Sequence, residues 1–284
     1  MIGVYFKGRL GNQMFQYVFY KYIKAENPGK LIFFSNPHHA YLATYFELEK
    51  FQSLTLESKI YSILIRFVPN ILFFKNVFIH SFVYPRKVAV KSFKVYNGYF
   101  QTDWYVKQLK EKPEFKIKPQ YIQAFEEEYG DVFRNEKTIA VHIRRTDYLK
   151  YGKRDISLPI EYFKDRLAEI QDIDTYKLFF VSDDIPFVKQ TFTAKPNYIF
   201  SSNDEIIDFQ IIQNANIAII SNSSFGWWAA YLNKKGGRIY APKNWLAFRI
   251  GAEHPKGIMT EKFIWKEVIK EKVEVATVSL DGVS

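Results

Sequence analysis

Four residues that could do chemistry lie close together in the sequence: His142, Arg144, Arg145 and Asp147. They follow the apolar run 139–141 and so lie at the carboxyl end of a predicted strand, the edge where ligands bind in an open α/β sheet. His142 and Arg144 should point to one side of the strand, and Arg145 should point to the other side or lie past the strand end. Because the planar fork of arginine matches phosphate oxygens, the cluster predicts a site for a phosphorylated substrate. The alternative is an exposed strand end whose arginines pair with surface acids.

A second candidate phosphate site lies between a predicted strand at 217–220 and the helix that follows it. Its residues are Ser221, Ser223, Ser224 and Phe225. A helix that begins here would present backbone N–H groups, which bind phosphate without any charged side chain. An ordinary N-cap serine is the alternative interpretation.

Two acidic segments lie near the strand predicted at 178–181. Asp183 and Asp184 follow this strand, where a carboxylate can accept hydrogen bonds from a nucleotide base or from ribose hydroxyls. Helix capping and metal binding are the alternative roles. Asp172 and Asp174 resemble an acidic metal-binding triplet, but they precede the strand and so lie at the wrong edge of the sheet. We therefore expect no metal site.

The segment near the N-terminus that contains Gly8 and Gly11 is polar. Its glycines lack the spacing of a dinucleotide-binding loop or a P-loop. The segment is therefore either a tight turn between a strand and a helix or a polar lip. In the second case Arg9, Asn12 and Gln13 would face a cleft between domains.

The composition limits the class of protein. The chain has 284 residues, a formal net charge of +10, a pI near 9.3 and no cysteine. The lack of cysteine excludes disulfides and thiolate metal sites and fits a reducing cytoplasm. The first residues lack the features of a signal peptide, and no uncharged apolar run reaches the ~18 residues of a membrane-spanning helix. The basic charge fits nucleic acid, anionic membrane or phosphorylated substrates as partners.

Strands and helices alternate along the chain, which predicts an α/β fold with parallel sheets and helices on both faces. A strand–helix–strand unit is expected at 2–6, 14–26 and 31–34, and further strands at 95–100, 139–143, 178–181, 198–200, 217–220 and 238–240. A helix-capping box is expected at 202–205. The polar segment around Glu136 divides the chain into 1–136, 137–262 and a C-terminal tail, 263–284, with weak order after about 271.

Residues 59–94 are apolar and aromatic, and part of this segment is predicted to be helical. Its basic residues are Lys59, Arg66, Lys75, Arg86, Lys87, Lys91 and Lys94. Two interpretations remain open: contact with anionic lipid, or a buried helical subdomain with a solvated basic rim.

Five segments together resemble family 11 glycosyltransferases, the α-1,2-fucosyltransferases. The segments are 8–17, 98–101, 142–148, 182–184 and 221–228, and they span most of the chain. The combination of His-x-Arg-Arg-x-Asp with Ser-Asn-Ser-Ser-Phe-x-Trp-Trp is specific. The resemblance implies a GT-B-like fold, in which two Rossmann-like domains face a central cleft. Residues 1–136 would form the acceptor-side domain and residues 137–262 the nucleotide-sugar-binding domain.

The resemblance also implies a reaction. Fucose would pass from GDP-fucose to the 2-hydroxyl of a galactose-terminated glycan, free or lipid-linked, with inversion at the anomeric carbon. No metal or other cofactor would take part. The enzyme would be cytoplasmic, with peripheral contact to the inner face of the membrane as an option.

By the same resemblance, Arg144 would hold the pyrophosphate of the donor and Arg145 would orient the cluster. The donor-binding residues would be His142, Arg145, Asp183, Asp184, Ser221, Ser223, Ser224 and Phe225. Of these, His142 and Asp183 would meet the nucleoside, and the last three would line the phosphate pocket. The cleft loop would comprise Gly8, Arg9, Asn12 and Gln13.

An inverting transfer needs a base that takes the proton of the acceptor hydroxyl. Asp147 is the candidate, because it lies just beyond the strand end. Its alternative role is structural, either pairing with Arg145 or capping the next turn. Asp155 is a second candidate base.

Two other functions compete with this one. A nucleic-acid-binding protein would use the same net charge and the 18% aromatic residues. The scattered basic residues and the lack of a recognisable motif argue against it. The same fold with a different nucleotide sugar or linkage is the other alternative.

Overall fold

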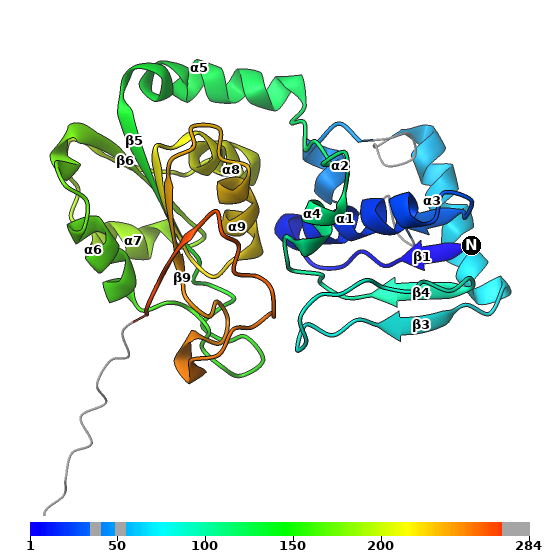
Figure 1. Cartoon of the computed structure of the whole chain (residues 1–284). Helices are drawn as coiled ribbons and strands as arrows, with labels where there is room; N and C mark the ends of the chain where they lie inside the picture. The colour runs from blue at the N-terminus through cyan, green and yellow to red at the C-terminus, as the bar shows by residue number, and fades with distance from the viewer. Residues whose placement is uncertain (35–40, 49–54, 269–284) are drawn as a thin grey trace, which may run out of the picture.

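The computed structural model describes residues 1–34, 41–48 and 55–268. It contains two α/β domains, with the N-terminal domain on the right of Figure 1 and the C-terminal domain on the left. The weak order predicted after residue 271 lies outside the described residues.

The N-terminal domain is built on a four-stranded sheet in the order β2-β1-β4-β3, in which every neighbouring pair is parallel. The strand–helix–strand unit predicted for residues 2–34 is confirmed, because β1 and β2 are adjacent and α1 connects them. The elements of this domain are β1 (Ile2–Val4), α1 (Leu10–Glu26), β2 (Ile32–Phe34), α2 (Tyr41–Tyr45), α3 (Leu56–Ile71), β3 (Lys75–Phe78), β4 (Lys94–Asn97) and α4 (Trp104–Gln108).

The C-terminal domain holds a six-stranded parallel sheet in the order β10-β9-β8-β5-β6-β7. This is the strand order of doubly wound nucleotide-binding sheets, which reverses here between β5 and β8 and creates a crevice for ligands. The predicted parallel α/β architecture is confirmed. The strands are β5 (Lys137–Ile143), β6 (Tyr176–Ser182), β7 (Tyr198–Phe200), β8 (Ile217–Ile220), β9 (Arg238–Pro242) and β10 (Ile264–Lys266).

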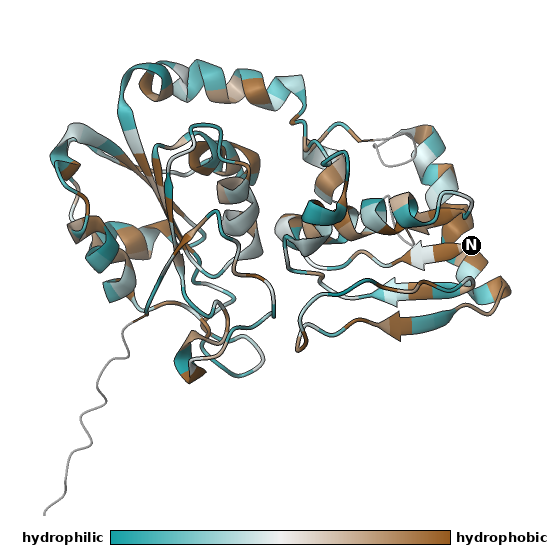
Figure 2. Ribbon diagram, in the orientation of Figure 1, coloured by the Kyte–Doolittle hydropathy of each residue, from teal (hydrophilic) through white to brown (hydrophobic). Residues whose placement is uncertain are grey.

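Helices cover both faces of this sheet, whose apolar strands run through the middle of the domain in Figure 2. Alternate residues of β5 enter two cores: Val141 packs with Phe163 of α6, whereas Ala140 belongs to the core on the side of α8 and α9. The helices are α5 (Pro119–Asn135), α6 (Ile160–Ala168), α7 (Ile185–Thr191), α8 (Glu205–Asn214) and α9 (Ser224–Tyr231), with short 3-10 helices at Ile173–Thr175 and Phe248–Ile250. Although α5 precedes the boundary expected at residue 136, it packs against α8 and β5 of this domain.

Three local predictions were wrong. The helix expected from residue 14 begins at Leu10, so the glycine-containing segment forms its first turn. The capping box at 202–205 does not form, because the N-cap residue Asp204 makes no side-chain capping hydrogen bond. Residues 264–266 are not tail: they pair with β9, and Phe263 beside them is buried.

The two domains share a hydrophobic core where α1 packs against α9. Phe15 of α1 contacts Trp227 and Trp228 of α9, with ring centroids 4.7 and 4.9 Å apart. Gly11 permits this close approach, since a Cβ there would lie 2.4 Å from the backbone nitrogen of Phe225. The first turns of α1 and α9 are therefore held together.

Candidate active site

A cavity of about 970 Å³ lies between the two domains, at the switch point of the C-terminal sheet. The cleft that the sequence predicted between two domains is thus present. The predicted site residues that line the cavity are Gly8, Arg9, Asn12, His142, Arg144, Asp147, Asp183, Ser223, Ser224 and Phe225. Within the described part of the chain, four other predicted site residues do not line the cavity: Gln13, Arg145, Asp184 and Ser221.

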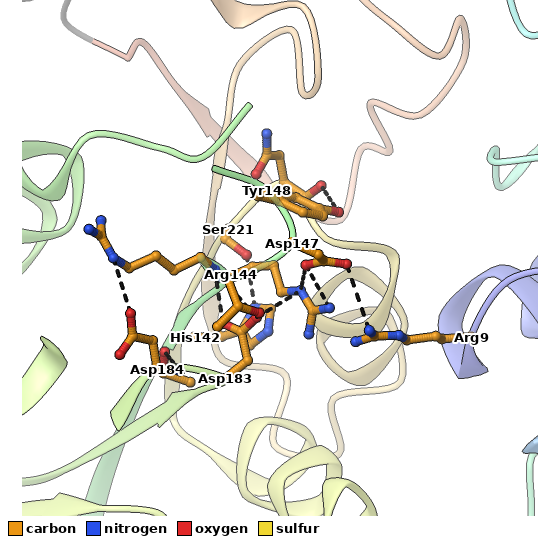
Figure 3. A network of polar contacts seen from close by, with 12 residues as sticks. Arg9, His142, Arg144, Asp147, Tyr148, Asp183, Asp184 and Ser221 are labelled. Atoms are coloured by element: carbon orange, nitrogen blue, oxygen red, sulfur yellow. Dashed lines mark hydrogen bonds and ion pairs between the residues drawn. The ribbon is translucent and has the colours of Figure 1, made fainter. Parts of the chain in front are cut away.

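The Arg144 side chain enters this cavity between two carboxylates (Figure 3). Its Nε donates to Asp147 Oδ1 at 2.8 Å and lies 3.3 Å from Asp183 Oδ2. Its Nη2 lies 2.8 Å from Asp147 Oδ1. The side chain is 17% exposed, so its charge is less screened than it would be in open solvent. A diphosphate entering the cavity would meet a guanidinium that is already held in position.

His142 packs behind Arg144 and is almost fully buried. Its Nδ1 lies 3.1 Å from Ser221 Oγ, and its ring packs against Phe225 with centroids 5.6 Å apart. Burial, aided by the charge of Arg144, lowers the pKa of His142 to about 3, so the imidazole is neutral near pH 7. Gly226 permits the packing, because a Cβ there would lie 2.5 Å from His142 Nδ1. Ser221 therefore acts on the site through His142.

Arg145 lies past the end of β5, one of the two places expected for it, and its side chain points away from the cavity. Its Nε lies 3.2 Å from Asp184 Oδ2, and its guanidinium stacks 3.5 Å from the ring centroid of Phe187. Asp184 also caps α7 by accepting a hydrogen bond from the backbone N–H of Phe187 at 3.3 Å. The geometry gives no support to direct donor contact by Arg145 or Asp184. The pair instead anchors the backbone beside Arg144.

The Asp183 carboxylate holds the loop that follows β5. It accepts hydrogen bonds from the backbone N–H groups of Arg145 at 2.8 Å and Thr146 at 3.1 Å, and from the Thr146 hydroxyl. Arg144 Nε lies 3.3 Å from Asp183 Oδ2. Because these partners occupy most of its acceptor sites, Asp183 positions the loop. Its contact with a nucleoside stays a prediction.

The N-terminus of α9 opens onto the cavity through Ser223, Ser224 and Phe225. Ser223 is the N-cap residue, but its side chain makes no capping hydrogen bond. The first N–H groups of a helix lack intrahelical partners and carry partial positive charge. Since α9 follows β8, which pairs with β5, these groups lie at the same sheet edge as Arg144.

Asp147 links the two domains across the cavity. Its Oδ2 lies 3.9 Å from Nη2 of Arg9, which approaches from the N-terminal domain (Figure 3). Burial favours a higher pKa for Asp147, but the hydrogen bond and charge of Arg144, with the charge of Arg9, outweigh it and lower the pKa. Asp147 therefore pairs with Arg144 and not, as its alternative role supposed, with Arg145.

The polar lip at the start of α1 is present, with one exception. Gly8 turns the chain at a φ of +77°, which favours glycine. Arg9 and Asn12 line the cavity, and Asn12 Oδ1 accepts a hydrogen bond from Gln101 Nε2 at 2.8 Å. Gln13 is buried and donates to the Gly8 carbonyl at 3.0 Å. Its predicted place in the cleft is wrong, because the helix begins earlier and turns this side chain inward.

Glu205 and Asp208 of α8 form an acidic end of the cavity that was not predicted from the sequence. Burial raises the pKa of Asp208 to about 7, and the charges of Asp204 and Glu205 add to the effect. Asp208 Oδ1 accepts a hydrogen bond from the Ser201 hydroxyl. The acidic spacing after a strand was the available signal, but we interpreted it only as a helix cap. Arg154, within the basic run that follows the strand-end cluster, also lines the cavity and was missed.

The fold and the cavity place the protein in the class of two-domain α/β proteins of the GT-B type. The sequence matches Glycosyl transferase family 11 over residues 1–259, and the chain belongs to this family. The solved structure of NodZ alpha-1,6-fucosyltransferase co-crystallised with GDP superposes with a TM-score of 0.51, covering 81% of this chain and 92% of that chain. At 10% sequence identity this likeness concerns the fold alone, and it confirms the predicted GT-B-like architecture.

Two relatives from Escherichia coli are more similar in sequence. The O-antigen biosynthesis glycosyltransferase WbnK is 32% identical over 125 residues, which is 41% of each chain. An alpha-1,2-colitosyltransferase is 31% identical over 182 residues, 57% of this chain and 60% of that protein. The matched part therefore spans less than two thirds of either relative.

Proposed function

We propose that the protein transfers fucose from GDP-fucose to the 2-hydroxyl of a galactose-terminated glycan, with inversion and without a metal ion. The observation that carries this proposal is the convergence of Arg144 and the uncapped N-terminus of α9 on one cavity. Both are donors suited to a diphosphate. Family membership and the GDP in the NodZ structure support the choice of nucleotide.

In this reaction the acceptor oxygen attacks the anomeric carbon of fucose as the bond to the phosphate oxygen breaks. Negative charge then accumulates on the departing GDP. Arg144 and the N–H groups of Ser224 and Phe225 would neutralise that charge, and removing one such donor commonly costs ~2.7–4 kcal/mol of barrier. Among the described residues, no group of three or more His, Asp or Glu side chains is arranged to hold a metal ion.

Asp147 is the proposed base for the acceptor proton, because it lines the cavity between the domains. Asp155 is less suited, since its Oδ1 already accepts hydrogen bonds from the backbone N–H and the hydroxyl of Ser157. It is also not among the described residues that line the cavity. We expect Asp147→Asn to lower turnover at saturating donor at least ~10²-fold while GDP affinity changes little. Near-normal turnover of this variant, measured by GDP release, would leave Asp147 with the structural role alone.

The nucleoside end of the donor would lie against Asp208. A carboxylate there can accept two hydrogen bonds, from the ring N–H and the amino group of guanine. Uracil has no such pair of neighbouring donors. Asp183, whose acceptor sites are largely used within the protein, is the weaker candidate.

Calorimetric titration with GDP, UDP and GDP-fucose, each with and without chelator, tests the proposal. We expect GDP and GDP-fucose to bind, UDP to bind at least about tenfold more weakly, and the chelator to change nothing. A protein that ignores GDP, or binds it only when magnesium or manganese is present, would contradict the proposal.

A second candidate donor sugar follows from the similarity to an alpha-1,2-colitosyltransferase. Transfer assays that offer fucosyl and colitosyl donors to one galactose-terminated acceptor separate the two. Linkage analysis of the product decides whether the 2-hydroxyl is the site of attack. Repeating the assay with free and with lipid-linked acceptors shows which form is used.

A further inference from the structure

The helix α3 carries its apolar side chains on the outside. Its buried residues are Ser58, Ser62 and Ile65, two of them polar. The exposed apolar residues recur with helical spacing along one stripe: Ile60 (52% exposed), Ile63 (58%), Leu64 (61%), Phe67 (55%) and Ile71 (68%). A surface helix of a globular protein normally shows the reverse arrangement, with its apolar stripe facing the core.

The amino edge of the N-terminal sheet extends this apolar surface. Phe73, in the turn after α3, is 87% exposed, and Phe93, before β4, is 50% exposed. The backbone N–H of Lys75 donates to the Phe93 carbonyl at 3.1 Å, which brings the two turns together. We name the surface formed by Ile60, Ile63, Leu64, Phe67, Ile71, Phe73 and Phe93 the α3 face.

Both phenylalanines in these turns adopt backbone conformations that disfavour bulky residues. The φ angle is 51° at Phe73 and 56° at Phe93, in the left-handed region. Unfavourable backbone conformations of this kind concentrate at functional sites. Here the first turn leaves the Phe73 ring in solvent, whereas the Phe93 ring is half exposed and packs edge-on against Phe74 with centroids 5.4 Å apart.

Basic residues border the α3 face. Between residues 55 and 94, Glu57 is the single acidic residue beside seven lysines and arginines. Lys59 on α3 and Lys75 at the start of β3 are both exposed. The charge of Lys87 is paired, since its Nζ lies 2.6 Å from Glu26 Oε2. An apolar stripe bordered by basic residues is typical of helices that lie in the interface of an anionic membrane.

We propose that the α3 face docks the protein on an anionic lipid bilayer. In Figure 1, α3 lies at the outer end of the N-terminal domain, far from the C-terminal domain. The cavity opens at the opposite, carboxyl edge of the sheet, so docking leaves it accessible. Contact is peripheral, since none of the described helices is long and apolar enough to cross a membrane. A second copy of the chain fits less well, because two basic faces repel each other.

Co-sedimentation of the full chain with vesicles tests this proposal. We expect binding to vesicles of phosphatidylglycerol and phosphatidylcholine, little binding to phosphatidylcholine alone, and weaker binding as salt rises. The double variant Ile63→Ser/Phe67→Ser should lose at least about tenfold in affinity, and Lys59→Gln and Lys75→Gln roughly fivefold each. The control is Ile250→Ser, an apolar residue of the C-terminal domain that is 78% exposed. It should bind like the unaltered chain.

Three results would overturn the proposal. They are equal binding to neutral and anionic vesicles, unchanged binding of the double variant, and a dimer in sedimentation velocity that the double variant converts to a monomer. The last result would make the α3 face an interface between copies. GDP titration serves as an independent readout, because none of the altered residues lines the cavity. Normal GDP binding without vesicle binding would refute the docking surface alone.

Discussion

Arg144 is the residue on which the proposed donor site depends most. Its guanidinium is held by Asp147 and Asp183 at the switch point of the sheet. A lysine there would supply one positive charge but not the planar fork of N–H donors. We expect Arg144→Ala to lower kcat by ~10²–10³-fold, and Arg144→Lys to restore little of it. Steady-state assays of GDP release would measure both.

Arg145→Lys is the matched control for this pair of variants. Arg145 is the neighbouring arginine but stacks on Phe187 outside the cavity. Its lysine variant should keep most of the turnover, and thermal unfolding should show that all the variants are folded. Full activity of Arg144→Lys would refute the bidentate grip on the diphosphate.

Asp208 should make GDP binding depend on pH. Its pKa is raised to about 7 by burial and by nearby carboxylates, while guanine would bind the ionised form. GDP should therefore bind up to about tenfold more tightly near pH 8 than near pH 6, with release of a proton that calorimetry in two buffers detects. Asp208→Asn should remove that difference, leaving only the titration of the GDP phosphate. Equal pH profiles for the two proteins would exclude Asp208 from the nucleoside site.

Asp208 should also make the stability of the fold depend on pH, with stability falling where GDP affinity rises. Its pKa in the folded chain lies above the ordinary value of 3.8, so the folded state binds a proton more tightly than the unfolded state. The contribution to stability is complete below pH 3.8 and is lost as pH rises through about 7. Denaturant unfolding of Asp208→Asn should therefore show a flatter dependence on pH across this window.

At the scale of elements, the site depends on how closely the first turn of α9 approaches β5. Gly226 lies against the imidazole of His142, and an alanine there would have to displace the ring or the helix. We expect Gly226→Ala to destabilise the fold by about 1–3 kcal/mol and to weaken GDP binding, because the helix N-terminus would shift. Denaturant unfolding and calorimetry would measure the two effects.

The control for that change is Gly130→Ala in α5. A Cβ at Gly130 would meet only the ends of the Glu126 and Arg134 side chains, which can move. Because alanine favours helix, this variant should be as stable as the unaltered chain or more stable. If both glycine variants behaved alike, close packing on His142 would not be the cause.

The local sequence pattern correctly predicted the strands whose own residues mark them clearly. The strands at 139–143 and 217–220 are short apolar runs followed by polar strand ends, and both were found where expected. The start of α1 was predicted too late because it is fixed at a distance, by packing of Gly11 on the backbone of α9. Strand β10 was missed for a similar reason, since its order comes from pairing with β9.

The candidate site shows the same division. The strand-end position correctly placed His142 and Arg144 at the cavity, but Arg144 and Arg145 both lie past the last residue of β5, so strand alternation could not assign their directions. Sequence could not show that Asp183 would be occupied by backbone N–H groups, because those partners follow the neighbouring strand β5, 37 and 38 residues earlier in the chain. Nor could it show the raised pKa of Asp208, which arises from burial in the folded state.

At the scale of the whole molecule, the aromatic residues of the most specific motifs serve the contact between domains. Phe15 contacts Trp227 and Trp228, which lie far from it in the sequence, and the three rings form one buried cluster. A core that continues from one domain into the other couples their unfolding. It also fixes the width of the cavity at the side where α1 meets α9.

This coupling predicts a single thermal transition for the two domains, with calorimetric and van't Hoff enthalpies that agree. Phe15→Ala should destabilise the protein by about 3–5 kcal/mol and split the transition, because it removes the ring that joins the two parts of the core. Phe163→Ala, in the separate core beneath α6, should destabilise the C-terminal domain to a similar extent without splitting the transition. Scanning calorimetry measures both variants. Two transitions in the unaltered chain would mean that each domain folds alone and that the shared aromatic cluster does not couple them.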